Sequence, residues 1–147
     1  MSPSWAAHPE REGVQTLGSE SFQIQSPEDI VMVRQAVRKK AVSLGLGLVD
    51  QTKFVTAASE LARNTLDYGG GGTARIDLVQ NGTRSGIRLT FEDRGPGIAD
   101  IELAMRDGYT SGNGMGLGLS GAKRLSHEFD IKSEVGVGTT VSILRWK

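Results

Sequence analysis

The chain has 147 residues, of which 17 are basic, 17 are acidic, 20 are glycine and none is cysteine. This length suits a single domain with its own core, and the balanced charge provides no broad field that would recruit nucleic acid or anionic lipid. The lack of cysteine excludes disulfides and thiolate metal sites and fits a reducing compartment, and no apolar run approaches the roughly 20 residues that span a bilayer.

The N-terminal segment and the first strand come before any helix signal. Residues 1–15 lack the basic-then-apolar order of a signal peptide and are expected to be flexible, so that residues 16–147 form the domain. Alternation of apolar and polar residues predicts a first strand over 16–25. Together with the composition, this predicts a cytoplasmic protein that binds neither nucleic acid nor membranes.

Two helices are predicted next. The first begins with Ser26 as N-cap and Pro27 at the first helical position, and it ends at Gly45 or Gly47. The second is expected to begin with Asp50 as its cap and to run to a group of four consecutive glycines.

The C-terminal half is predicted to contain two hairpins separated by a loop and a helix. Strands over 73–80 and 86–93 flank an Asn-Gly turn, which favours a hairpin because it tolerates positive φ. A short helix is expected over 117–129, and a final hairpin turns at Gly136 or Gly138. The order predicts an α/β fold, a two-layer sandwich with helices on one face of a mostly antiparallel mixed sheet.

Alternating glycines mark the loop before the short helix, at Gly112, Gly114, Gly116 and Gly118. Without Cβ atoms, successive backbone N–H groups can converge on an anion such as phosphate. A helix beginning at Leu117 would add its own unsatisfied N–H groups. A flexible loop is the alternative, and the pattern is neither a P-loop nor a dinucleotide fingerprint.

Asp93 opens the sequence DRGPG at the end of a predicted strand. Its carboxylate could organise an Asx-type turn. Alternatively, it could accept a hydrogen bond from an exocyclic amine, such as that of adenine, and so discriminate against a carbonyl at that position. Gly95 and Gly97 would then let a base approach the backbone closely.

Glu60 and Asn64 lie one turn apart on the second predicted helix and therefore share a face. Asn64 offers a neutral oxygen of the kind that Mg²⁺ accepts beside phosphates and water, and Glu60 could take the proton of an attacking hydroxyl. The alternative is an ordinary solvated helix face, as expected for Arg63 and Asp67. Thr139 could offer its hydroxyl to a ligand or simply favour a strand.

In their order, four motifs resemble those of one superfamily. ELARN (60–64), DRGPG (93–97), GNGMGLGL (112–119) and GTT (138–140) resemble the N box, the two G boxes and the closing Thr motif of the GHKL (Bergerat) ATP-binding fold. Beyond residue 20, the chain is most similar to the RsbT-type switch kinases, which are anti-sigma-factor serine/threonine kinases of stressosome pathways.

The resemblance implies ATP and Mg²⁺ as ligands and assigns roles to the motif residues. Asp93 would bind the adenine amine, in a pocket shaped by Gly95 and Gly97. Thr139 would complete the adenine site. The lid and phosphate cradle would comprise Gly112, Gly114, Gly116, Leu117 and Gly118.

The resemblance also implies the reaction. Asn64 would coordinate the Mg²⁺ that bridges the phosphates, and Glu60 would be the base for the acceptor hydroxyl. Many family members carry a basic residue or histidine shortly after the Asn, where this chain has Asp67 and Tyr68. Charge neutralisation of the phosphates is therefore expected from elsewhere, with Lys123 or Arg124 as candidates.

The expected partners are STAS-domain antagonist proteins, phosphorylated on serine or threonine, and a PP2C-type phosphatase that the kinase activates, with a sigma factor as a further candidate. A function of a different class is also consistent with these motifs. In that alternative the chain is a nucleotide-dependent module that binds a sigma factor or a phosphatase with little phosphotransfer.

Overall fold

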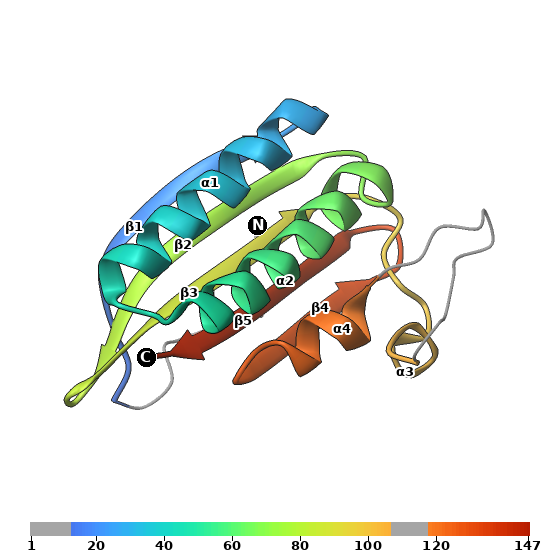
Figure 1. The fold of residues 1–147 in the computed structure, drawn as a ribbon. Helices are drawn as coiled ribbons and strands as arrows, with labels where there is room; N and C mark the ends of the chain where they lie inside the picture. Colours follow the sequence, from blue (N-terminus) through green and yellow to red (C-terminus); the bar gives the residue numbers. More distant parts are fainter. Residues whose placement is uncertain (1–12, 107–117) are drawn as a thin grey trace.

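The computed structural model describes residues 13–106 and 118–147. Its five strands form one sheet in the order β1-β2-β3-β5-β4, and α1, α2 and α4 lie on one face of it (Figure 1). The elements are β1 (Gln15–Ile24), α1 (Pro27–Leu44), α2 (Leu48–Asp67), β2 (Gly72–Asn81), β3 (Arg84–Asp93), α3 (Ile101–Ala104), α4 (Leu119–Arg124), β4 (Glu128–Glu134) and β5 (Gly138–Trp146). The predicted two-layer α/β class is confirmed. Every strand pairing in the described residues is antiparallel, so that part of the sheet is not mixed.

The predicted limits of α1 are confirmed. The Ser26 hydroxyl accepts a hydrogen bond from the backbone N–H of Asp29 at 3.4 Å, which satisfies a donor in the first turn. Gly45 ends the helix in the left-handed region, at φ 92°. The apolar stripe of the helix is buried against the sheet and comprises Ile30, Val33, Val37 and Ala41.

The start of α2 corrects the prediction that Asp50 caps it. The helix begins at Leu48 with Gly47 as N-cap, and Gly47 makes no side-chain capping bond. Asp50 lies in the first turn, and its carboxylate accepts a hydrogen bond from Arg145 at 2.6 Å. Asp50 is therefore used in a tertiary ion pair with a residue near the C-terminus, a use that local sequence rules cannot anticipate.

Both predicted hairpins are present. Asn81 pairs with Arg84, and Gly82 occupies the turn at φ 61°, so the loop between β2 and β3 is shorter than expected. The turn between β4 and β5 contains Gly136 at φ 81°. The helix expected over 117–129 ends at Arg124 instead, because the residues from Glu128 onward are paired with β5.

The main core lies between the helices and the sheet. Its largest fully buried side chains include Phe54, Leu61, Ile76 and Leu89. The other face of the sheet carries a smaller apolar cluster of Val14, Val79, Leu144 and Trp146. In the part of the chain that the structure describes, no helix has the length and apolar character needed to cross a membrane.

Candidate active site

A recess opens where α2, β3, β5 and the start of α4 meet. It encloses about 340 Å³ of space, including solvent at its mouth. Most of its lining is apolar, with a few polar groups, as is usual for small-molecule sites. The lining residues are Leu61, Asn64, Thr65, Tyr68, Phe91, Asp93, Ile98, Leu119, Thr139 and Val141. Three residues singled out in the sequence, from three different elements, thus line one recess.

Asp93 ends β3 at the base of the recess, opposite Gly72 on one side and Thr139 on the other. The Asp93 Oδ1 atom accepts a hydrogen bond from the backbone N–H of Gly95 at 2.9 Å, which is the predicted Asx-type turn. Burial raises the pKa of Asp93, and the charge of Glu92 adds to this, although hydrogen bonds from the Gly95 and Thr139 backbones oppose it. The Asp93 carboxylate therefore both stabilises the turn at Gly95 and lines the recess.

Glycines hold the backbone close to Asp93. A Cβ atom on Gly69 would lie 2.6 Å from Asp93 Oδ2, and one on Gly95 would lie 2.7 Å from the Gly69 carbonyl oxygen. Neither position has room for a side chain. Gly97 has φ +77°, and a Cβ there would lie 2.7 Å from the carbonyl carbon of Glu134. Gly69 was not among the predicted site residues, although it stands in the group of four glycines.

Two further residues that the sequence analysis did not assign to the site support its walls. The Tyr68 hydroxyl donates to the Gly97 carbonyl at 2.9 Å and so connects the end of α2 to the glycine turn. The Ser133 hydroxyl lies 2.8 Å from the Thr139 hydroxyl, and it accepts a hydrogen bond from the Ile98 N–H at 2.7 Å. Ser133 thus holds Thr139 and the loop after β3 in place.

Glu60 and Asn64 are both partly buried on α2. Asn64 lines the recess, and Glu60 lies one turn earlier, beside the start of α4. Gly118 is the N-cap of α4 at φ 63°, and a Cβ atom there would lie 2.6 Å from Glu60 Oε2. The structure therefore brings the Glu60 carboxylate next to the end of the glycine loop.

The remaining predicted residues fall elsewhere. Lys123 and Arg124 are exposed in the last turn of α4, and neither lines the recess. Arg63 and Asp67 are exposed, as expected for a solvated helix face. Four residues of the predicted lid and cradle lie outside the described residues: Gly112, Gly114, Gly116 and Leu117.

The polarity of the recess suits an aromatic base that carries an amine, because apolar walls surround a partly buried carboxylate. Asn64 can supply one oxygen ligand to Mg²⁺. No group of three or more acidic or histidine side chains within residues 13–106 and 118–147 could hold a metal on its own. Mg²⁺ here would therefore need phosphate oxygens and water for most of its ligands, as Mg²⁺ usually has in nucleotide sites.

Comparison with known proteins identifies the family of this chain. The family model of histidine kinase-, DNA gyrase B- and HSP90-like ATPases matches residues 49–147. The chain is 44% identical over 123 residues to the serine/threonine-protein kinase RsbT of Bacillus subtilis, covering 84% of this chain and 92% of that protein. The predicted ATP-binding class is thereby confirmed.

Solved structures share the fold at lower identity. The RsbU and RsbW domains of a Mycobacterium tuberculosis protein superpose with a TM-score of 0.62 at 19% identity, covering 88% of this chain and 33% of that one. The SiaB-SiaC complex of Pseudomonas aeruginosa gives 0.54 at 14% identity, with coverage of 90% and 91%.

The family model matches more than half of the chain, and the alignment with RsbT covers most of it. The chain therefore belongs to the histidine kinase-, DNA gyrase B- and HSP90-like ATPase family, as a serine/threonine kinase of the RsbT type.

Proposed function

We propose that this chain binds MgATP in the recess and transfers the γ-phosphoryl group to a serine or threonine hydroxyl of a STAS-domain antagonist protein. One observation carries the proposal: Asn64, Asp93 and Thr139 line a single recess, and Glu60 lies one turn from Asn64 on the same helix. In the same pathway the kinase would activate a PP2C-type phosphatase.

The chain's residues divide the work of binding. The Asp93 carboxylate accepts a hydrogen bond from the exocyclic amine of adenine, and Thr139 donates its hydroxyl to the ring directly or through a water. Asn64 would supply an oxygen to Mg²⁺, and the charge of the ion would offset that of the phosphates. Tyr68 and Ser133 keep the walls in place through their bonds to the loop after β3.

Glu60 performs the proton transfer. The acceptor hydroxyl oxygen forms a bond to the γ-phosphorus while the bond from that phosphorus to the β,γ-bridging oxygen breaks, and the electron pair leaves with ADP. Glu60 accepts the hydroxyl proton. No hydrogen bond or ion pair with the described residues occupies its carboxylate, which supports this role.

The partner classes follow from the resemblance to RsbT-type kinases. They are supported by the 44% identity to RsbT and by the names of the two solved structures, both of which concern partner-switching regulators. The experiment below identifies the acceptor protein and the residue that receives the phosphoryl group.

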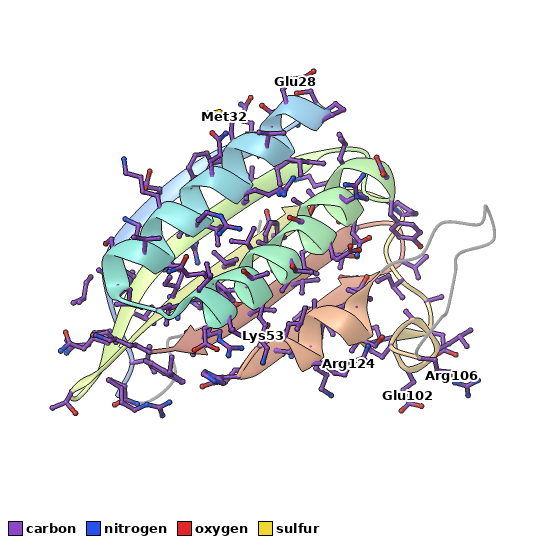
Figure 2. All side chains as sticks on the ribbon, in the orientation of Figure 1. Glu28, Met32, Lys53, Glu102, Arg106 and Arg124 are labelled. Carbon is purple, nitrogen blue, oxygen red and sulfur yellow. The ribbon has the colours of Figure 1, made fainter. Side chains whose placement is uncertain are left out.

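The decisive test is transfer of labelled γ-phosphate from MgATP to the STAS-domain proteins encoded beside this chain. We expect one of them to be labelled, and Glu60→Ala to lower the rate by about 10²–10⁴-fold while MgATP still binds. Glu28→Ala is the control, because Glu28 is an exposed acid at the start of α1 (Figure 2).

The alternative predicts a different result. If MgATP and the partner both bind but no labelled protein forms, the chain is a nucleotide-dependent binding module. The activity of the PP2C-type phosphatase with and without the kinase then becomes the appropriate assay. Equal transfer rates for Glu60→Ala and the parent would mean that Glu60 is not the base.

A further inference from the structure

One side of α2 carries accessible side chains on both sides of Glu60. Residues 49, 53, 56, 60 and 63 recur every three or four positions and so lie along one side of the helix. We call them the α2 stripe. Val49 is 67% exposed, and Lys53, Thr56 and Arg63 are exposed, whereas Glu60 is only partly so. Glu60 is thus the partly buried member of the stripe, and it lies one turn from Asn64, which lines the recess.

Most of the exposed charged side chains on α1, α2 and α4 are basic. Exposed Asp67 ends α2, one turn after Arg63. Within residues 31–66 and 118–125, every exposed charged side chain is basic. Those side chains are Arg34, Arg38, Lys39, Lys53, Arg63, Lys123 and Arg124. The two acids in these ranges are only partly exposed, and one of them, Asp50, is paired with Arg145. Because the whole chain is neutral, the compensating acidic residues lie in other parts of the molecule.

Lys53 lies within reach of a protein segment that approaches Glu60. Lys53 precedes Glu60 by seven positions on α2, a rise of about 10 Å. Figure 2 shows Lys53 at the border of α2 with α4, and Arg124 on the adjoining surface of α4. About three residues of extended chain span the same distance. A segment with its hydroxyl at Glu60 can therefore place a neighbouring carboxylate near Lys53.

We propose that the α2 stripe is the docking surface for the acceptor protein, and that it recognises an acidic segment flanking the acceptor hydroxyl. The inference rests on the proposed function, because it takes Glu60 as the group that meets the hydroxyl. A protein suits this surface better than a nucleic acid. Exposed Val49 offers apolar contact, and the Glu60 carboxylate would repel a phosphate backbone.

The first test measures phosphotransfer to the STAS-domain protein that the parent labels. Lys53→Glu should lower kcat/KM about tenfold, mainly through KM, because it reverses a charge that steers the acceptor. Added salt should lower the parent's kcat/KM and reduce this difference. The control is Lys132→Glu, which makes the same charge change on β4. Its neighbours Ile131 and Phe129 face the core, so alternation points Lys132 away from the helices.

A binding measurement separates this inference from the proposed function. The affinity of the ADP-loaded kinase for each of the STAS-domain proteins encoded beside this chain, measured by calorimetry, does not depend on transfer. If no protein is labelled, the proposed function fails, and the inference still stands or falls on whether Lys53→Glu weakens this binding. Equal binding by Lys53→Glu and Lys132→Glu would overturn the docking surface. So would tight, Lys53-dependent binding of a short DNA duplex in place of the protein.

Discussion

Gly69 lies directly against the carboxylate of Asp93: a Cβ atom at position 69 would lie 2.6 Å from Asp93 Oδ2. The contact joins the end of α2 to the end of β3, across the base of the recess. Gly95 packs on the same glycine. The absence of a side chain at position 69 therefore sets how closely the two elements that carry the site can approach.

Gly69→Ala should weaken ATP binding about tenfold, or about 1.4 kcal/mol, because the methyl group would displace the Asp93 carboxylate. Isothermal calorimetry with MgATP measures this. Gly47→Ala is the matched control, since a Cβ atom at Gly47 meets nothing within 4 Å. Parent-like affinity in Gly69→Ala would show either that the methyl group does not displace Asp93 or that ATP binding does not depend on the position of Asp93.

Asp93→Asn should remove most of the affinity for ATP. The Gly95 N–H would hold the amide oxygen, as it now holds Oδ1 at 2.9 Å, and so would turn the amide NH₂ toward the recess. That NH₂ would face the amine of adenine, and two donors cannot bond to each other. A loss of at least about tenfold is expected, since hydrogen bonds to charged groups contribute about 1.5–3 kcal/mol. Equal calorimetric affinities would remove Asp93 from the adenine site.

The same substitution should leave the protein at least as stable at pH 7. Burial raises the pKa of Asp93 above its ordinary value of 3.8, so the folded state retains this proton at pH values where the unfolded chain has lost it. The contribution of Asp93 to stability therefore falls as the pH rises from 3.8 through the raised pKa. Asp93→Asn lacks this dependence.

Urea unfolding of the parent and of Asp93→Asn, at pH 7 and again near pH 4, checks the sign. The advantage of Asp93→Asn in free energy of unfolding should shrink as the pH falls through that window. ATP affinity of the parent should decline over the same range, because adenine requires the ionised carboxylate. A parent that is clearly more stable than Asp93→Asn at pH 7 would contradict the burial argument.

Arg145→Met should destabilise the fold more than Asp50→Ala does. The Arg145 guanidinium donates to Asp50 Oδ1 at 2.6 Å and to the Leu125 carbonyl at 2.8 Å, and its side chain is only 10% exposed. Its loss would leave the Leu125 carbonyl, at the end of α4, without this partner. We expect a cost of about 1–3 kcal/mol.

Asp50→Ala should cost less than about 1 kcal/mol. The Asp50 side chain is 46% exposed, so water can take its place beside the Arg145 guanidinium, which keeps its bond to the Leu125 carbonyl. Denaturant unfolding of both variants and of the double variant gives the coupling between the two residues. If Asp50→Ala proved as costly as Arg145→Met, the ion pair with Asp50, and not the bond to Leu125, would account for the stability that Arg145 provides.

Helix ends and hairpin turns that depend only on residues close in the sequence were predictable from the sequence. Ser26, Pro27 and Gly45 define α1 because capping and left-handed glycine act over a few residues. The Asn-Gly pair and Gly136 mark the two hairpin turns for the same reason. The end of α4 was not predictable in this way, because Phe129 and its neighbours pair with β5 instead of extending the helix.

For the motif residues too, the sequence and the tertiary structure determine different properties. The sequence by itself determined which side chains have suitable chemistry, Glu60, Asn64, Asp93 and Thr139, because donor, acceptor and base are properties of single residues. Only the tertiary structure decided that three of them line one recess and that the fourth lies beside Gly118. It also decided the supporting contacts of Gly69, Tyr68 and Ser133. Those contacts join residues far apart in the chain, and no local spacing rule encodes the packing of a helix against a sheet that brings them together.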